Sequence, residues 1–97
     1  MPKAWVYILK CSDDSYYTGS TTQLQKRLGE HKNGEGGEWT KKRLPIELVF
    51  YQEVSGQNQA YLLEQQIKKW SRAKKEALIE GEWDLLKYLA RKPKFRK

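Results

Sequence analysis

Two short strand-forming segments lie near the N-terminus, with a polar cluster of turn-forming residues between them. Residues 4–11 (AWVYILKC) are rich in β-branched and aromatic side chains, and residues 12–15 (SDDS) separate them from residues 16–19. Strand-forming runs on either side of a short polar cluster are typical of a β-hairpin. We therefore expect the chain to begin with two antiparallel strands.

The first of these strands is apolar on both of its faces. Successive side chains of a strand point to opposite sides of the sheet. One face carries Trp5, Tyr7 and Leu9, and the other carries Val6, Ile8 and Lys10. A strand with apolar residues on both sides is typical of the middle of a sheet, so this segment is predicted to be the central strand.

The rest of the chain alternates between helical and extended patterns. Thr22 and Gln25 have the spacing of a capping box, which predicts a helix from there to about Lys32. The further elements expected are a break at 33–37, a loop at 39–44, a strand at 46–54, and helices at 58–72, 74–80 and 83–91. Gly81 should stop the helix at 74–80. This order, ββαβα plus short C-terminal helices, predicts an α+β domain with a small three-stranded, largely antiparallel sheet.

Length and composition indicate one small domain. The 97 residues are too few for two domains, so we expect a single domain at 1–91 and a basic tail at 92–97. No apolar run has the length of a membrane span, and no signal peptide precedes the first strand. We therefore expect a cytoplasmic monomer with no membrane partner. Cys11 lacks a disulfide partner and should be a small buried residue.

The net charge of +7 lies in the last third of the chain. Basic and acidic residues balance over 1–67, and residues 68–97 carry the whole excess. Such a segment attracts polyanions, of which nucleic acid is the commonest. On charge alone, a solvated and solubilising segment is an equally good interpretation. The cations in this segment that we expect to contact nucleic acid are Lys68, Lys69, Arg72, Lys74 and Lys75.

One predicted helix carries a cation and an imidazole on neighbouring turns. Arg27 and His31 are four residues apart, beside a seam formed by Leu24 and Leu28. By themselves they are read more simply as a solvated surface arginine and as a histidine that is satisfied near a helix end.

A later predicted helix places one carboxylate beside its apolar stripe. The stripe consists of Ala60, Leu63, Ile67 and Trp70. Glu64 lies at its border, so the carboxylate should be half shielded from solvent. A carboxylate in this setting can bind a hard divalent cation. The alternative is an ion pair with Lys68, one turn further along.

Together these residues resemble the GIY-YIG nuclease family. Trp5-Val6-Tyr7 occupies the position of the first signature tripeptide, with Trp5 in place of glycine. Tyr17-Thr18-Gly19 occupies the position of the second, with Thr18 in place of isoleucine. The resemblance continues through Thr21, Leu24, Arg27, Leu28 and His31, then through Glu64 and the run 67–72. It covers most of the chain and is closest to small stand-alone bacterial members.

The resemblance implies a role for each of five residues. Glu64 would hold a single divalent ion, Mg²⁺ or Mn²⁺, on the scissile phosphate. Tyr7 would accept a proton from the attacking water, and Tyr17 would position that water or the phosphate. Arg27 would bind the phosphate and stabilise the transition state. His31 would be a proton shuttle or a hydrogen-bond partner of a tyrosine.

A tyrosine can act as a base near neutral pH only where its phenolate form is stabilised. A phenol with a pKa of about 10 is a poor base at neutral pH unless nearby positive charge stabilises the phenolate. Arg27, Lys10 and a bound metal could supply that charge. Lys10 also matches a lysine of some family members and would contact a further phosphate. We expect the five catalytic candidates to line one concave surface.

One departure from the family pattern leaves the function open. Many active members have an asparagine after the glutamate helix, where this chain reads Arg72-Ala73-Lys74-Lys75. The preferred hypothesis is a metal-dependent DNA endonuclease that is structure-selective or related to repair. One alternative is a nucleic-acid-binding module on the same fold, with weak or no catalysis. Another is a protein-interaction domain whose basic segment binds an acidic partner.

Overall fold

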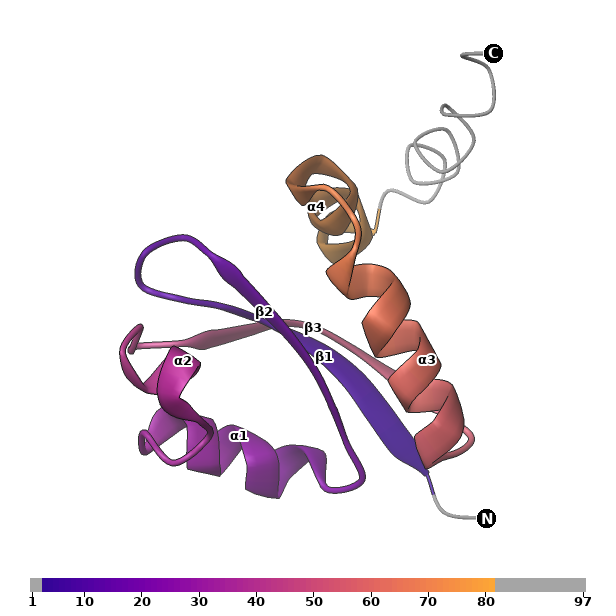
Figure 1. The fold of residues 1–97 in the computed structure, drawn as a ribbon, viewed down its shortest axis with the longest axis horizontal. Helices are drawn as coiled ribbons and strands as arrows, with labels where there is room; N and C mark the ends of the chain where they lie inside the picture. The colour runs from indigo at the N-terminus through magenta and orange to yellow at the C-terminus, as the bar shows by residue number, and fades with distance from the viewer. Residues whose placement is uncertain (1–2, 82–97) are drawn as a thin grey trace.

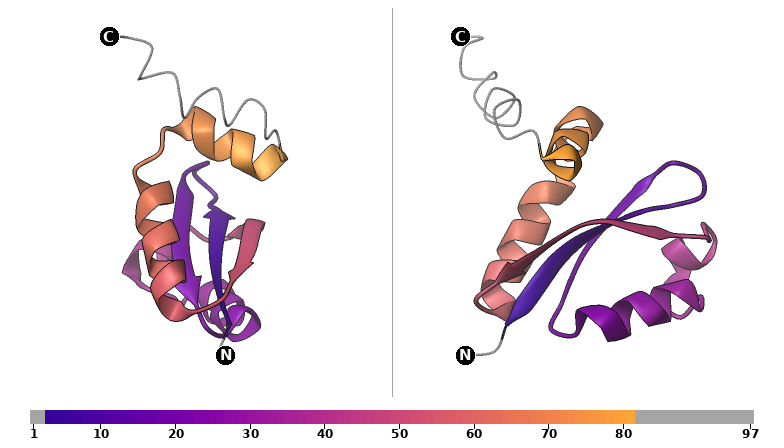
Figure 2. Two further views of the ribbon diagram at one scale, coloured as in Figure 1. Left: turned by 90° about the vertical axis from the view of Figure 1, so that its right-hand side faces the viewer. Right: turned by 180° about the vertical axis from the view of Figure 1, so that it is seen from behind.

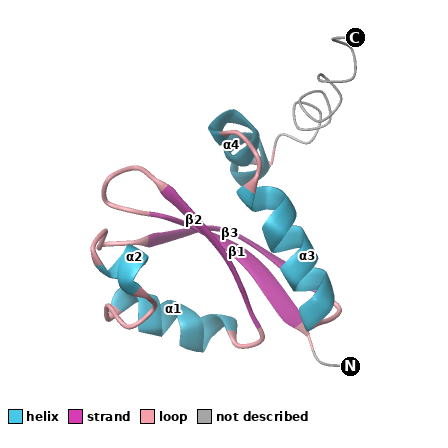
Figure 3. Cartoon of the chain, in the orientation of Figure 1, coloured by secondary structure: helices cyan, strands magenta, loops and turns pink. Residues whose placement is uncertain are grey.

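The computed structural model describes residues 3–81, which form a three-stranded sheet with helices on both faces (Figure 1). The strands are β1 (Ala4–Lys10), β2 (Tyr16–Thr21) and β3 (Glu47–Val54). The helices are α1 (Leu24–Lys32), α2 (Glu38–Lys41), α3 (Gln57–Lys68) and α4 (Arg72–Glu80). Figure 3 shows them coloured by secondary structure. The predicted α+β class with a small antiparallel sheet is confirmed.

β1 is the central strand, as its apolar pattern predicted. The strand order is β2-β1-β3, and β1 runs antiparallel to both neighbours. In the β1–β2 hairpin, Tyr7 lies opposite Gly19. The pairing of β1 with β3 is irregular between Ile8 and Leu9, and an irregularity of this kind increases the local twist of a sheet.

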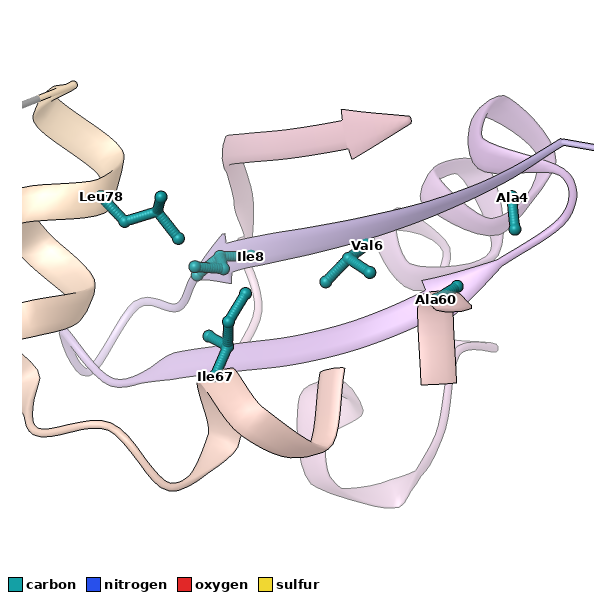
Figure 4. Close-up of a cluster of buried hydrophobic side chains, with 6 residues drawn as sticks. All are labelled: Ala4, Val6, Ile8, Ala60, Ile67 and Leu78. Carbon is teal, nitrogen blue, oxygen red and sulfur yellow. The ribbon is translucent and has the colours of Figure 1, made fainter. Parts of the chain in front are cut away.

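The two faces of β1 are buried against different helices, which Figure 2 shows on opposite sides of the sheet. On the α3 face, the core cluster consists of Ala4, Val6, Ile8, Ala60, Ile67 and Leu78 (Figure 4). On the α1 face, Tyr7 and Leu9 pack with Leu24 and Leu28 of α1. Burying one large apolar side chain contributes about 1.5–3 kcal/mol, so each cluster stabilises the fold by several kcal/mol.

The capping box predicted at the start of α1 is wrong, because no side chain caps this helix. The helix begins at Leu24, and the preceding Gln23 makes no side-chain cap, so the capping box expected at Thr22 is absent. Instead, Oγ1 of Thr21 accepts the N–H of Gln23 at 3.0 Å. The loop expected at 39–44 was also wrong in part, since it overlaps the short helix α2.

The helix predicted at 58–72 ends four residues early, and the helix predicted at 74–80 is present as α4 but begins at Arg72. α3 ends at Lys68, and Oγ of Ser71 then accepts the N–H of Lys74 at 3.2 Å as the N-cap of α4. Gly81 ends α4 in the left-handed conformation, with φ 74°, as predicted. The helix predicted at 83–91 and the tail at 92–97 lie outside the described residues. Within residues 3–81, no helix has both the length and the apolar character needed to cross a membrane.

Candidate active site

A buried chain of hydrogen bonds joins β1, α1 and α2 on the α1 face of the sheet. The hydroxyl of Tyr7 lies 3.0 Å from Nε2 of His31, and Nδ1 of His31 lies 3.1 Å from Oγ1 of Thr40. Thr40 in turn contacts the carbonyl oxygen of Gly37 at 3.4 Å. Tyr7, His31 and Thr40 are each no more than 1% exposed. Three elements therefore fix one imidazole ring.

The direction of these hydrogen bonds follows from the charge of His31. Burial lowers the pKa of the His31 imidazole and the positive charge of Arg27 lowers it further, so the ring is neutral at pH 7. A neutral ring donates from one nitrogen and accepts at the other. The carbonyl of Gly37 can only accept, so the Thr40 hydroxyl donates to it and receives the Nδ1 proton of His31. Nε2 is left to accept the hydroxyl proton of Tyr7.

Tyr7 is a protonated phenol in this environment. Burial raises the pKa of Tyr7 to about 12, and the neighbouring Arg27 offsets only part of the rise. Arg27 therefore does not produce a resting phenolate in the metal-free protein. Tyr7 can act as a base only if its own proton leaves as another arrives. The bare Nε2 of His31 is in position to take that proton.

Tyr17 lies beside the same imidazole. Its ring centroid is 5.3 Å from that of His31 and 6.3 Å from that of Tyr7. The ring centroid of Trp39 lies 5.9 Å from that of Tyr17, and Cζ of the Arg43 guanidinium lies 4.0 Å from the centre of the Trp39 ring. Tyr17 is half-buried rather than buried, so it is the more accessible of the two tyrosines.

Arg27 is held in place by two acceptors. Nη1 donates to Oε1 of Glu30 at 3.0 Å, and Nη2 donates to the carbonyl oxygen of Gly36 at 2.8 Å. A polar recess of about 190 Å³ opens beside it. The recess is lined by Thr21, Thr22, Gln23, Lys26, Arg27 and Glu30. A guanidinium held this way retains free N–H donors and can bind a phosphate oxygen.

Two glycines leave space for the buried side chains of Tyr7 and His31. A Cβ atom on Gly19 would lie 2.6 Å from the Tyr7 hydroxyl oxygen, so this position in β2 must lack a side chain. A Cβ atom on Gly36 would collide with Nδ1 of His31. Neither Gly36 nor Thr40 is predicted as a site residue from the sequence. The glycine-rich run at 34–37 is the available signal, but on its own it indicates only the end of a helix.

Glu64 approaches the tyrosines from the other side of the sheet. It lies on α3, which packs against the opposite face of β1. Its Oε1 accepts the hydroxyl of Ser20 on edge strand β2 at 2.5 Å, and its Oε2 lies 2.8 Å from Nζ of Lys68. Burial is the main cause of the raised pKa of Tyr7, and the charge of Glu64 adds to it. The candidates therefore lie on both sides of β2, and the prediction that all five line one concave surface is wrong because α3 carries Glu64 on the face opposite Tyr7.

The oxygen atoms around Glu64 suit a hard divalent cation. Glu64 offers a carboxylate and Ser20 a hydroxyl, while residues 3–81 contain no group of three or more His, Cys, Asp or Glu placed to hold a metal. Mg²⁺ usually keeps several waters and binds one or two carboxylates together with substrate phosphates. The donor set fits that pattern. The ion pair with Lys68, which was the alternative role for Glu64, is also present.

Three of the expected nucleic-acid contacts are already paired with carboxylates, and two of these lie outside α4. Lys68 is bound to Glu64 near β2, and this bond raises the pKa of Lys68. Lys10 lies on the α3 face of β1, away from Tyr7, and its Nζ is 3.8 Å from Asp14.

The remaining expected contacts lie on or before α4. Nε of Arg72 is 3.0 Å from Glu76, and its Nη1 donates to the carbonyl oxygen of Asp14 at 2.7 Å. Nζ of Lys74 lies 4.2 Å from the ring centre of Trp70. Burial lowers the pKa of Lys75, and Lys69 is exposed. The cations of α4 therefore lie on the α3 side of the sheet, apart from Arg27.

Comparison with known proteins assigns the chain to a family. A profile of the GIY-YIG catalytic domain matches residues 3–77. The chain belongs to the GIY-YIG family. A UPF0213 protein from Natronomonas pharaonis is 44% identical over 78 residues, which are 80% of this chain and 92% of that protein.

Two solution NMR structures are similar to this GIY-YIG domain. A UPF0213 protein from Bacillus halodurans is 38% identical with a TM-score of 0.53, over 80% of this chain and 83% of that one. A protein from E. faecalis is 31% identical with a TM-score of 0.57, over 84% of this chain and 86% of that one. The family resemblance seen in the sequence is confirmed, and membership of the GIY-YIG family supports a nuclease-like role.

Proposed function

We propose that this GIY-YIG protein is a metal-dependent endonuclease that hydrolyses DNA phosphodiesters, with a structure-selective or repair-related role. It would act as a monomer in the cytoplasm. The observation that carries the proposal is the buried hydrogen bond from Tyr7 to a neutral His31, placed beside the guanidinium of Arg27. This arrangement combines a proton acceptor with a fixed positive charge, which phosphodiester hydrolysis requires.

The tyrosine and histidine would move the proton of the attacking water. Tyr7 takes that proton on its hydroxyl oxygen while its own proton passes to Nε2 of His31. The hydrogen bond to Nε2 is already formed at 3.0 Å, so little rearrangement is needed. Thr40 keeps the ring oriented through Nδ1. Tyr17, which is more accessible, would orient the water or a phosphate oxygen.

Arg27 would bind the phosphate and offset the charge that develops in the transition state. Its contacts with Glu30 and Gly36 fix the guanidinium before substrate arrives, and preorganised charge of this kind is an effective source of catalysis. A planar guanidinium can meet two phosphate oxygens at once.

Glu64 and Ser20 would hold the divalent ion, Mg²⁺ or Mn²⁺. When bound, such an ion supplies Lewis-acid polarisation of a phosphate oxygen. Lys68 lies 2.8 Å from the same carboxylate and neutralises it in the metal-free protein.

The direct test is incubation of the purified protein with supercoiled, branched and single-stranded DNA, in Mg²⁺, Mn²⁺ or EDTA. Glu64→Gln keeps the size of the side chain and removes the charge, so cleavage should fall by at least about a hundredfold, the loss of about 3 kcal/mol typical of one preorganised contact. Glu76→Gln is the matched control, because that carboxylate lies on α4 and pairs with Arg72.

Three outcomes of this test differ in meaning. Metal-dependent cleavage that disappears in Glu64→Gln and persists in Glu76→Gln supports the proposal. Equal cleavage by Glu64→Gln points to another site or a contaminant. DNA binding without any cleavage by the wild type would favour the alternative of a non-catalytic binding module. That alternative is motivated by the stretch Arg72-Ala73-Lys74-Lys75, which lacks the asparagine of many active members.

A further inference from the structure

A large cavity opens on the α1 face of the sheet, beyond the candidate catalytic residues. Trp5 of β1 and Leu48 and Tyr51 of β3 form its sheet side, and Leu24 and Leu28 of α1 line the helix side. Its volume is about 630 Å³, within the range of about 300–1,000 Å³ that is typical of small-molecule sites. Such sites are mostly apolar with a few polar groups at defined places.

The polar groups of this cavity connect it to the recess beside Arg27. Gln23, Gln25 and Lys26 contribute to its lining. Gln23 and Lys26 also line the Arg27 recess, so the two hollows adjoin. A ligand that places an anionic group beside Arg27 and Lys26 can therefore extend an apolar group into the cavity.

We propose that this cavity binds an unpaired nucleobase of a DNA strand whose phosphate lies beside Arg27. The inference rests on the proposed nuclease function and specifies its substrate class, namely DNA with an unstacked base close to the bound phosphate. Trp5 and Tyr51 both line the cavity with aromatic rings, and Tyr51 is 59% exposed. Every base has a flat face that can stack on an aromatic side chain.

Charge and hydrogen bonding favour a nucleotide over a purely apolar ligand. The cations of Lys26 and Arg27 lie where the backbone phosphates would run. The side-chain amides of Gln23 and Gln25 can each donate and accept, as the edges of bases require.

The cavity also favours DNA that contains an unpaired base over a regular duplex. A base inside a duplex is covered on both faces by its neighbours and must be flipped out to enter a pocket, which is easiest for a mismatched or single-stranded base. Trp5 occupies a position where the family signature has glycine, so this aromatic lining is a feature of the present chain rather than of the signature.

The test compares the binding of two labelled strands in EDTA, where cleavage does not interfere. One strand is a ten-nucleotide oligothymidylate. The other is a deoxyribose–phosphate chain that has the same number of phosphates and no bases. Fluorescence anisotropy should show that the wild type binds the oligothymidylate at least about tenfold more tightly. Tyr51→Thr, which keeps β-propensity but removes the ring, should abolish most of this difference, and Tyr51→Phe should retain it.

Gln52→Thr is the matched control, because Gln52 is the exposed neighbour of Tyr51 on β3 and points to the other face of the sheet. It should retain the wild-type ratio. Equal binding of both strands by the wild type would overturn the proposal. So would an unchanged ratio in a Tyr51→Thr variant with the circular dichroism and melting temperature of the wild type.

A second measurement needs no variant. The indole N–H signal of Trp5 in the NMR spectrum of the wild type should shift on addition of oligothymidylate and stay in place on addition of the abasic chain. An identical response to both strands would exclude the base site. Base-dependent binding in a protein that cleaves no DNA with Mg²⁺ or Mn²⁺ would instead overturn the proposed nuclease function while supporting the base site.

Discussion

Tyr7 and His31 form a hydrogen-bonded pair that burial keeps uncharged. The pKa of Tyr7 is raised to about 12, chiefly by burial, so its hydroxyl is protonated at neutral pH. Burial likewise lowers the pKa of His31 and keeps the ring neutral. Each polar atom of the pair has a partner, which is the usual condition for placing such groups in a core. At neutral pH the folded protein therefore holds both groups in their uncharged forms.

Removing one hydroxyl group tests this pair. Tyr7→Phe should abolish cleavage, because no group remains to relay the proton to His31. It should also reduce the free energy of unfolding by about 1–3 kcal/mol, since Nε2 of His31 is left buried without a partner. Cleavage rates and urea denaturation measure the two effects. Tyr16→Phe is the control, because its hydroxyl contacts Glu76 on the other side of the sheet. Full cleavage by Tyr7→Phe would rule out the relay.

The lowered pKa of His31 predicts that acid destabilises the fold. In the unfolded chain the imidazole takes up a proton near its ordinary pKa of about 6.5, whereas the folded protein resists protonation until a lower pH. Between these two values the unfolded state holds more protons, so stability falls as the pH drops below about 6.5. Urea denaturation at pH 7.5 and 5.5 should show this loss. His31→Asn should show a smaller loss, and an equal loss would assign the effect to other groups.

Among the helices and strands, those with a regular apolar pattern could be predicted from the sequence, whereas the short helix α2 could not. The apolar pattern of residues 4–11 predicted a central strand, and the spacing of Arg27 and His31 placed both on one helix. The sequence did not reveal α2, because a four-residue helix is too short for its apolar period to be visible. Thr40, which orients His31, lies on that helix. Its role depends on the path of the chain between α1 and α2, which no local pattern encodes.

The connection between α1 and α2 offers a test of close packing. Gly36→Ala should destabilise the protein by about 1–3 kcal/mol and slow cleavage, since its methyl group would displace the His31 ring. Gly29→Ala is the matched control, because nothing lies within 4 Å of its Cβ position in α1. That change should instead stabilise the helix by about 0.5–1 kcal/mol. Equal effects of the two substitutions on unfolding and cleavage would contradict the packing argument.

Within residues 3–81, basic side chains lie on both sides of the sheet. Lys26 and Arg27 line hollows on the α1 side, and Arg72, Lys74 and Lys75 lie on α4 on the other side. The sequence located the charge excess correctly along the chain but could not show this division. Faces of the molecule are set by the sheet between α1 and α4, and charge counts contain no information about that geometry.

Shortening the chain tests how far the C-terminal charge contributes to DNA binding. Removal of residues 93–97 deletes three cations. If they contact phosphates, the slope of log K against log salt on duplex DNA should flatten by about 2–3 units. Anisotropy titrations at several salt concentrations measure that slope. An unchanged slope would mean that these residues serve only solubility.

The register of the β1–β2 hairpin positions candidate site residues on both faces of the sheet. Gly19 and Ser20 are adjacent in β2 and face opposite sides of the sheet, where one admits Tyr7 and the other binds Glu64. A slip of one residue exchanges the two faces of a strand. It would turn a side chain against the tyrosine hydroxyl and leave the carboxylate facing a glycine. The length of the turn at 11–15 therefore determines which residues of β2 face the Tyr7 hydroxyl and the Glu64 carboxylate, so one turn positions side chains on both faces of the sheet.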